Sequence, residues 1–589
     1  ATGVGEAQNH AAETSTTVVN STLLVTERRA KQESMQLEVL RVVREITSAS
    51  DSAITLETPL LEAGLDSLAA TELSSRLREL QGIALSPTIV FEHPTSRELA
   101  AHLVAVKMPT APTHCGEAEC QSVITLTNFH KSSNVRITSA VGQSAGGCTD
   151  SAARVKLQDA CGDALGGVPT LRWILELVVN FDSLTNMQAT CVRHGGFLIG
   201  AQRFDSCAFR ISPAEAATMD PQQRLLLEYG YIALHMSSHR RSALKGGNGG
   251  VFLGIERPDW AMAMPKVLRS SVFAVTSDNL SIAAARASFV FDLLGPCMSI
   301  DAACAASLVA VHGGISATSR GECSDALALA VSLKLMPHNT IGMASAGMLS
   351  IDGRCKTLDA AANGMVRTEG VGAVMLRHEG TDVVLGGSAV RQDGRSASLT
   401  SPNGLAQRSL LQVALNTASA TAEEVAVTEL HGTGTALGDP IEAVGIMGVH
   451  GSSVRATPLG LGAIKGSVGH SEAASGQIGI LRLSGVIAQR TMAGNTQLRA
   501  LNPLVGAHLE QMTVRSILPL QRQVTWDGMK TISSFGYSGI IAHQIQYEER
   551  GSMASEALAF GSRGAEAAGG GVFGAERSAF DPRPALVYR

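Results

Sequence analysis

The sequence predicts an α/β protein that follows a small helical module. The chain has 589 residues, more than one ordinary hydrophobic core accommodates, so at least two domains are expected. Apolar residues recur at helical spacing over 34–107, whereas short β-rich runs alternate with helical patterns over 137–548. Hydrophobic residues make up 45% and charged residues 17% of the chain, which is typical of a globular protein.

Composition excludes several classes of protein. A net charge of −5 offers no basic face for nucleic acid, and no apolar run is long enough to span a membrane. The first residues lack a secretory signal, and because they also lack an initiating Met we expect a fragment of a longer protein. The 10 cysteines are scattered without a C-x-x-C pair, which argues against a disulfide framework or a metal site. We therefore expect an intracellular, cytoplasmic location, with an organelle left open.

The first ordered module is predicted to be helical and acidic. Residues 1–33 lack apolar periodicity and are interpreted as a flexible lead-in. From Ser34 to Lys107 the spacing predicts several helices, the last beginning at a capping box formed by Thr95 and Glu98. This module holds ten acidic and six basic residues, a net charge of −4. Such a surface favours docking on basic partners.

Two further segments are interpreted from composition alone. Residues 108–136 contain prolines and His and Ser clusters, which predicts a linker between the module and the α/β segment. Residues 549–589 form a Gly/Ala-rich tail. Its G-x-G-x-x-G pattern follows no strand and is interpreted as an accident of composition.

Ser67 is the strongest candidate for modification in the helical module. It lies in EAGLDSLAATEL, where Asp66 and Ser67 would also serve as a simple helix cap. In an acidic module of helices, with FEHPT before the last one, this motif resembles an acyl carrier protein. The resemblance implies a four-helix carrier domain over 34–107 with 4′-phosphopantetheine attached to Ser67. A helix N-terminus suits the phosphate of that link.

Two other serines lie in motifs of hydrolytic or acyl-transfer enzymes. Ser144 in GQSAG matches the nucleophile elbow of α/β-hydrolases, but its triad partners cannot be nominated. Ser471 in VGHSEAASG is similar to an acyltransferase elbow whose closing glycine is replaced by Ala473. We interpret both serines as bystanders.

Cys304 stands among alanines in SIDAACAASLVAVH, ahead of an apolar helical run. A free cysteine usually behaves as a small buried hydrophobic residue. Here, however, His431 in ELHGTGTALGDPIEA and His470 in AIKGSVGHSEAASG follow β-like runs in glycine-rich turns, with Lys465 ahead of the second. Together these residues fit a cysteine nucleophile with separate histidine assistants.

The same motifs resemble the β-ketoacyl synthase domain of a modular polyketide synthase. Three further segments carry the resemblance: SSFGYSG around Phe535, FDSCAFRISPAEAATMDPQQRLLLE and MLSIDGRCKTLDAAANGMVRTEGVGAV. The resemblance covers most of 137–547. It implies a thiolase-like, five-layered α/β/α/β/α fold over 137–548 and a homodimer through this domain. The implied reaction is polyketide elongation by decarboxylative Claisen condensation of a carrier-bound malonyl-type extender with an acyl chain on the active-site cysteine.

The resemblance also assigns roles. Cys304, at a helix N-terminus that favours the thiolate, takes the acyl chain. His431 and His470 donate hydrogen bonds to the thioester oxygen as the enolate develops. Lys465 holds His470 in position, with Glu472 as its partner.

Further roles concern the oxyanion and the cofactor arm. The backbone N–H groups of Cys304 and Phe535 serve the oxyanion of the acyl transfers. Thr433 and Thr435 contact the pantetheine arm. The alanines beside the nucleophile clear room for the thioester.

The chain departs from the family in two places. Ala302, Ala305 and Ala306 replace hydroxyl residues of D-T-A-C-S-S-S, and Ile540 with Ile541 replaces the Thr-Asn of T-N-A-H. These changes make the pocket less polar and leave the rate and the substrate preference open.

Two alternatives stay open, a condensing enzyme of the fatty acid synthase type and a non-elongating synthase that only transfers chains. No acyltransferase, ketoreductase or thioesterase signature is present. Partners are therefore expected to be acyl and malonyl thioesters on carrier proteins, a separate acyltransferase and a phosphopantetheinyl transferase.

Overall fold

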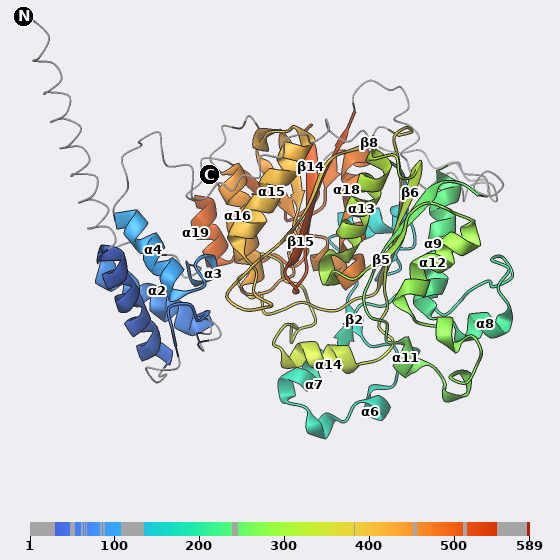
Figure 1. Cartoon of the computed structure of the whole chain (residues 1–589), viewed down its shortest axis with the longest axis horizontal. Coiled ribbons are helices and arrows are strands. Elements are labelled where there is room, and N and C mark those ends of the chain that lie inside the picture. The colour runs from blue at the N-terminus through green and yellow to red at the C-terminus, as the bar shows by residue number, and fades with distance from the viewer. Residues whose placement is uncertain are drawn as a thin grey trace, which may run out of the picture. The chain divides into compact units, whose positions relative to one another are not determined.

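The computed structural model describes residues 30–47, 54–60, 63, 65, 67–82, 85, 89–107, 135–237, 246–381, 383–451, 455, 457–510, 515–549 and 586–588. The chain divides into two compact units (Figure 1). The helical unit comprises Ala1–Asn128 with Gly394–Asn403, and the α/β unit comprises the remainder. Among the helices of the described residues, none is both long enough and apolar enough to cross a membrane.

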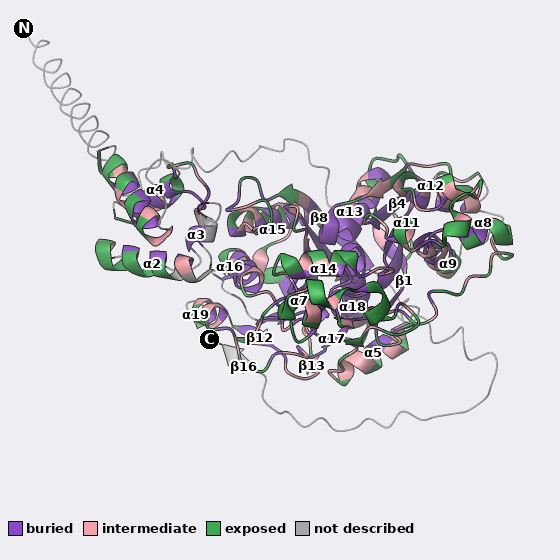
Figure 2. Ribbon diagram, turned by 90° about the horizontal axis from the view of Figure 1, so that it is seen from below, coloured by how far each residue is buried: buried purple, intermediate pink, exposed green. Residues whose placement is uncertain are grey.

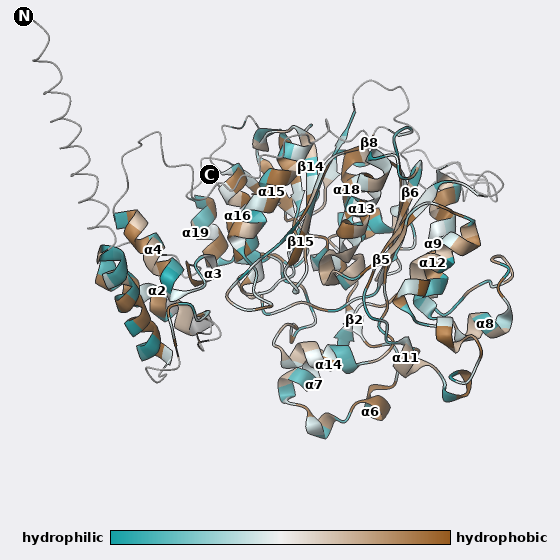
Figure 3. Ribbon diagram, in the orientation of Figure 1, coloured by the Kyte–Doolittle hydropathy of each residue, from teal (hydrophilic) through white to brown (hydrophobic). Residues whose placement is uncertain are grey.

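The helical unit contains four helices among its described residues: residues 30–47, α2 Ser67–Gln81, α3 Ile89–Glu92 and α4 Ser96–Lys107. The first helix begins four residues before Ser34, inside the predicted lead-in. Figure 3 shows hydrophobic and hydrophilic residues alternating around these helices. Their apolar faces meet at fully buried leucines such as Leu73 and Leu103, which is how a short bundle gains its stability. The backbone N–H of Glu98 donates to Thr95 Oγ1 at 3.2 Å, one of the two bonds of the predicted capping box.

A twelve-stranded sheet organises the α/β unit, in the order β16-β12-β10-β9-β14-β15-β8-β1-β7-β6-β4-β5. Its strands are β1 Arg136–Ser144, β4 Gly249–Ile255, β5 Cys297–Ile300, β6 Asp325–Ser332, β7 Gly370–Arg377, β8 Val383–Gln392, β9 Val425–Glu429, β10 Leu459–Gly462, β12 Ser516–Leu518, β14 Met529–Phe535, β15 Ile540–Glu548 and β16 Leu586–Tyr588. Two small sheets pair β2 Gly166–Gly167 with β3 His194–Gly195, and β11 Thr491–Met492 with β13 Gln523–Val524.

The large sheet consists of two halves with the same topology. In the first half β1, β7 and β6 pair antiparallel, and β6, β4 and β5 pair parallel. In the second half β8, β15 and β14 pair antiparallel, and β14, β9 and β10 pair parallel. A single bridge from Arg136 to Val384 joins the halves. The fold is therefore an internal duplication, which the sequence does not reveal as a repeat at fixed period.

Helices follow the same repeated order. The first half carries α9 Pro221–Met236, α12 Leu280–Phe291 and α13 Ala306–Ser319, and the second carries α15 Gly404–Ala418, α16 Gly438–His450 and α18 Ser475–Gln489. In Figure 1 they form layers: α15 and α16, the second half-sheet, α13 with α18, the first half-sheet, then α9 and α12. This arrangement confirms the predicted five-layered α/β/α/β/α fold.

Shorter elements complete the α/β unit. They are α5 Ser151–Asp159, α6 Leu175–Val178, α7 Asn186–Cys191, α8 Pro213–Thr218, α11 Trp260–Ala263, α14 His338–Ser345, α17 Lys465–Val468 and α19 Pro503–Glu510. The short 3₁₀ helices are η1 Phe181–Ser183, η2 Lys266–Leu268, η3 Ala274–Thr276, η4 Ala303–Ala305, η5 Ala422–Glu424 and η6 Glu472–Ala474.

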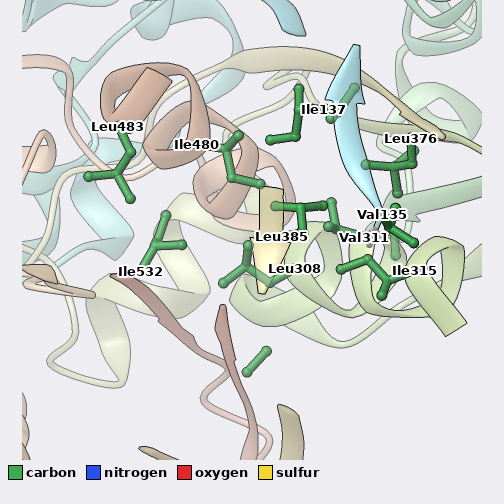
Figure 4. Packing of buried hydrophobic residues seen from close by; sticks show 14 of the residues in the cluster. Val135, Ile137, Leu308, Val311, Ile315, Leu376, Leu385, Ile480, Leu483 and Ile532 are labelled. Atoms are coloured by element: carbon green, nitrogen blue, oxygen red, sulfur yellow. The ribbon is translucent and has the colours of Figure 1, made fainter. Parts of the chain in front are cut away.

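The main core lies between the two half-sheets. Leu308 and Val311 of α13 and Ile480 of α18 point toward Leu385 and Leu376 of the strands (Figure 4). Both faces of the central strands are covered by helices, so these strands read as continuous apolar runs in the sequence. Figure 2 shows α13 mainly buried, whereas α8 and α14 expose much of their surface.

Candidate active site

Cys304 lies in η4, between the end of β5 and the start of α13. Its side chain is buried, and its carbonyl accepts hydrogen bonds from Ser534 Oγ at 2.6 Å and Ser475 Oγ at 3.1 Å. Ala303, just before it, has a φ of 47°, a left-handed conformation that costs free energy for a residue with a side chain. Neighbouring elements thus hold the nucleophile candidate at a strained corner.

The alanines around Cys304 belong to the core. Ala302, Ala305 and Ala306 are at most 3% exposed and pack in the cluster between the half-sheets. A Cβ on Gly254 of β4 would lie 2.6 Å from the backbone of Ala306, so the strand passes directly against the start of α13. The small side chains thus permit this close packing, and their predicted role of making room for a thioester stays a prediction.

His431 and His470 lie together beside Phe535, the residue after the Ser534 that hydrogen-bonds the Cys304 carbonyl. Their ring centroids are 5.3 Å apart with the rings nearly perpendicular, and the Phe535 ring lies 5.3 Å from that of His431. Nδ1 of His431 and both ring nitrogens of His470 are buried without a hydrogen-bond partner. Burial and the nearby Lys465 lower the pKa of His470 to about 3 and that of His431 well below its ordinary value. Both rings are therefore neutral at physiological pH.

Backbone hydrogen bonds fix the two histidines. The N–H groups of His431 and Gly432 donate to Glu442 at 2.6 and 2.8 Å. His470 bridges the segment before β7, because its N–H donates to Val366 O and its carbonyl accepts from Thr368 N–H, both at 2.9 Å.

Glu472 does not pair with Lys465, and the structure corrects that expectation. Its carboxylate binds Arg367, with Nε at 2.5 Å, and also the Lys334 ammonium. Arg367 lies between the two residues that hold His470 by their backbones. Glu472 and Arg367 therefore fix the turn that presents His470.

The repeated fold explains this placement. Ala303 opens η4 before α13 with a φ of 47°, and Glu472 opens η6 before α18 with a φ of 45°. Cys304 is therefore matched by Ala473 in the second half. The duplication provides two equivalent corners, of which one carries a thiol and the other carries only a methyl group.

Lys465 is buried at the start of α17. Burial lowers its pKa, and the acidic side chains of Glu429 and Glu442 oppose that effect. Lys465 in turn acts electrostatically on Cys304 and on both histidines.

Tyr537 is a residue of the site that the sequence prediction missed. Its backbone N–H hydrogen-bonds the Cys304 thiol, whereas Phe535 contributes its ring beside His431. Burial, Glu256 and Glu472 raise the pKa of Cys304, and Lys465 with the Tyr537 amide opposes them. Burial therefore outweighs the stabilisation of the thiolate that a helix N-terminus predicts. The SSFGYSG motif held the signal for Tyr537, but the register of the turn was needed to select it.

Thr433 and Thr435 lie two residues apart in the turn after β9. Their hydroxyl oxygens are 3.2 Å apart, and the Thr435 hydroxyl accepts from Gly438 N–H at 3.1 Å. Thr433 is buried and Thr435 is partly exposed, so the pair runs from His431 toward the surface.

The three candidate serines differ in their structural positions. Ser67 is the first residue of α2, a fifteen-residue helix whose N-terminus suits a phosphate, while Asp66 lies outside the described residues. Ser144 ends β1, is 2% exposed and is followed by a turn, which excludes a nucleophile elbow at the start of a helix. Ser471 is buried beside Gly370.

Comparisons with families match both units. Residues 133–381 match the β-ketoacyl synthase N-terminal domain, 383–499 its C-terminal domain, and 38–103 a phosphopantetheine attachment site. The two synthase models together span 133–499, which includes Cys304, His431, Lys465 and His470.

Individual relatives agree with these families. The chain is 34% identical over 535 residues to polyketide synthase GfsA of Streptomyces halstedii, and 33% identical over 534 residues to erythronolide synthase EryA2 of Saccharopolyspora erythraea. Each match covers 88% of this chain but only 7% and 15% of those much longer proteins.

Two solved structures share the fold of the α/β unit. The ketosynthase from module 6 of the bacillaene synthase of Bacillus subtilis 168 matches with a TM-score of 0.62 and 29% identity, covering 71% of this chain and 72% of that one. The oxazolomycin ketosynthase domain OzmH KS7 of Streptomyces albus JA3453 matches with a TM-score of 0.66 and 27% identity, covering 71% and 75%.

Proposed function

Because the chain belongs to the β-ketoacyl synthase family and carries a phosphopantetheine attachment domain, we propose that it elongates a polyketide chain. The reaction is a decarboxylative Claisen condensation between an acyl group on Cys304 and a malonyl-type thioester. The observation that carries the proposal is the set of buried, unpartnered ring nitrogens of His431 and His470. These rings adjoin Phe535, which follows Ser534, the residue that hydrogen-bonds the Cys304 carbonyl.

Cys304 accepts the acyl chain in the first half-reaction. Its sulfur bonds to the thioester carbon, the bond from that carbon to the departing sulfur breaks, and the thiol proton ends on the departing thiol. The oxyanion formed on the way needs two donors. The backbone N–H of Cys304 supplies one, and the placement of the Tyr537 amide at the same sulfur favours Tyr537 over Phe535 for the other.

His431 and His470 act in the second half-reaction. As the extender loses CO2, negative charge develops on its thioester oxygen. Neutral imidazoles in a buried site donate hydrogen bonds to that oxygen without first giving up bonds to protein partners. The enolate carbon then attacks the acyl carbon on Cys304, and the Cys304 sulfur leaves.

Lys465, Thr433 and Thr435 support these steps. Burial lowers the pKa of both imidazoles, and the positive charge of Lys465 adds to that effect, so both stay in their neutral, donating form. The hydroxyls of Thr433 and Thr435 reach from the His431 turn toward the surface, where they would contact an incoming pantetheine arm.

The helical unit tethers intermediates through Ser67. The arm supplies a thiol that holds acyl groups as thioesters, and Ser67, the first residue of α2, is the proposed point of attachment. We expect a separate phosphopantetheinyl transferase to modify Ser67, and Ser67→Ala to abolish that modification. Extender loading falls to a separate acyltransferase. The described cysteines are free thiols, which favours the reducing interior of a cell.

A second copy of the chain is the proposed partner of the α/β unit. Strand β5 is the open edge of the first half-sheet, and large apolar side chains surround it. Phe289 is 86%, Leu294 71% and Met298 47% exposed. An exposed apolar edge strand can form hydrogen bonds with a strand of another chain. When two copies pair in this way across a two-fold axis, the same apolar patch is covered on both.

The alternatives are less well supported. A non-elongating synthase would not need both histidines beside the cysteine, and this site keeps them with unpartnered nitrogens. A condensing enzyme of the fatty acid synthase type is disfavoured by the relatives, which are polyketide synthases.

The experiment that tests the function separates the two half-reactions. Cys304→Ala removes the acyl acceptor but leaves the hydrogen-bond donors of decarboxylation. We expect this variant to lose acylation and condensation while still releasing labelled CO2 from a malonyl thioester. Cys323→Ala, which removes another buried free thiol two residues before β6, is the matched control and should keep all activities. Acylation of the same peptide in Cys304→Ala would show that the nucleophile is wrong.

A further inference from the structure

Glu256 is a half-buried carboxyl group that the proposed reaction does not use. It follows the last residue of β4, where Ile255 pairs with Val331 of β6. Two residues earlier, Gly254 lies against the backbone at the start of α13. The end of β4 therefore places Glu256 beside the corner that carries Cys304.

The Glu256 carboxyl hydrogen-bonds the Glu472 carboxyl. Two carboxyl groups in such contact share a proton, because two adjacent negative charges repel. Glu472 is held as the anion by Arg367 and Lys334, and Lys334 Nζ also donates to Ser332 Oγ at 2.6 Å. Burial and the charge of Glu472 raise the pKa of Glu256 to about 8, so Glu256 keeps the shared proton at neutral pH.

Cys304 lies within the electrostatic reach of this cluster. Glu256 and Glu472 both oppose ionisation of the thiol, whereas Lys465 and the Tyr537 amide favour it. The remaining ionisable groups around the corner are Tyr537, whose hydroxyl responds to Glu256, Cys304 and Asp301, and the two neutral histidines. Glu256 is therefore the acidic neighbour of Cys304 whose charge changes close to physiological pH.

We propose that Glu256 is a positioning residue that controls the reactivity of Cys304 through the proton it shares with Glu472. With the proton present, Glu256 is neutral, and only the Glu472 carboxylate, paired with Lys334 and Arg367, opposes the Cys304 thiolate. With the proton removed, a second negative charge opposes the thiolate, and acyl loading slows relative to a site without Glu256. Glu256 itself forms no bond to the acyl group. The inference rests on the proposed role of Cys304 as the nucleophile.

Alkylation of Cys304 by iodoacetamide across a pH series tests the inference without any acyl substrate. The full chain and its Glu256→Gln variant are alkylated between about pH 6 and about pH 10, and the rate at the Cys304 peptide is followed by mass spectrometry. Glutamine is neutral like the protonated glutamic acid, so below about pH 7 the two rates should agree within about twofold. Above about pH 8.5 the variant should react faster by on the order of tenfold, the effect of one charge at short range in a partly buried site.

Further variants and a control cysteine distinguish an electrostatic role of Glu256 from a structural one. Glu256→Asp restores a titrating carboxyl and should restore the pH profile of the original chain, which a purely structural role would not produce. Alkylation of the exposed Cys207 should be the same in every variant and reports on folding. If Glu256→Gln does not fold, Glu256→Ser serves as the neutral variant.

A constant ratio of variant to original rate across the pH series would overturn the inference. Failure of the proposed function is seen separately. Cys304 could take no acyl group from any thioester while its alkylation profile still depended on Glu256. That result would refute the proposed condensing function and would still support the role of Glu256.

Discussion

His431 and His470 show how single residues gain a function from burial. Each ring is neutral because desolvation opposes its charge, and ring nitrogens that would cost free energy if left unpaired are kept facing the site. Such atoms need a ligand or a water molecule to complete their hydrogen bonds, which agrees with the proposed binding of the thioester oxygen at this place.

Removing either imidazole should separate loading from decarboxylation. His470→Ala and His431→Ala should still accept an acyl group on Cys304, because that step uses backbone donors. Decarboxylation should fall by about two to three orders of magnitude in each, the usual effect of removing one oxyanion donor. Release of labelled CO2 and mass detection of the acyl-enzyme measure the two steps. Normal decarboxylation in both variants would exclude the enolate mechanism.

At the scale of elements, the site depends on the contact between β4 and the start of α13. Gly254 meets the Ala306 backbone there with no room for a side chain, and its strand ends beside Glu256. The position of the turn that carries Cys304 is therefore fixed by its packing against strand β4 of the sheet.

Gly254→Ala should destabilise the α/β unit and slow acyl loading. The added Cβ would lie 2.6 Å from Ala306 C and 2.7 Å from Ala306 O, and backbone cannot move aside as a side chain can. We expect a loss of about 1–3 kcal/mol in unfolding free energy, measured by denaturant titration. Gly485→Ala is the control, because no atom lies within 4 Å of its Cβ position in α18. It should be neutral or slightly stabilising. Equal effects of the two changes would refute the packing explanation.

At the scale of the whole molecule, the exposed edge at β5 decides the oligomeric state. Sedimentation of the purified chain at micromolar concentration should give a dimer. Met298→Lys places a charge on that edge and should shift the equilibrium toward monomer. Val524→Lys changes a side chain of similar exposure, 66%, on β13 and should leave the dimer intact. A monomeric original chain would refute the proposed dimer but not the chemistry.

Buried histidines should make the α/β unit sensitive to acid. Burial lowers the pKa of His450 to about 4 and that of His543 to about 3. The unfolded chain therefore binds more protons than the folded chain below about pH 6.5, so unfolding free energy falls as pH falls from about 6.5 toward these values. Each unit of lowered pKa corresponds to about 1.4 kcal/mol.

Denaturant titrations at about pH 7.5 and about pH 5 measure this loss. His450→Gln should reduce the difference between the two, because one buried titrating group is gone. His338→Gln, at an exposed position in α14, should leave the difference unchanged. An equal difference in the original chain and His450→Gln would refute this explanation.

The sequence by itself determined the class of fold, the five layers and the family. Alternation of apolar runs dictates buried strands, and motifs such as those around Cys304, His431 and His470 carry local information that survives without coordinates. The motif around Ser67 likewise predicts the attachment site, and Ser67 is the first residue of α2. The roles of these residues remain predictions.

Only the tertiary structure decided which groups meet. Glu472 binds Arg367 and Lys334 rather than Lys465, and the Tyr537 amide rather than that of Phe535 reaches the thiol. These partners lie on different elements, and no local pattern encodes contacts between residues that are 105 and 138 positions apart in the chain. The duplication was hidden for the same reason, since the two halves share the pairing of their strands and not a visible repeat of side chains. Burial is likewise a property of the assembled layers, and it is the largest cause of the neutral histidines and of the raised pKa of Glu256.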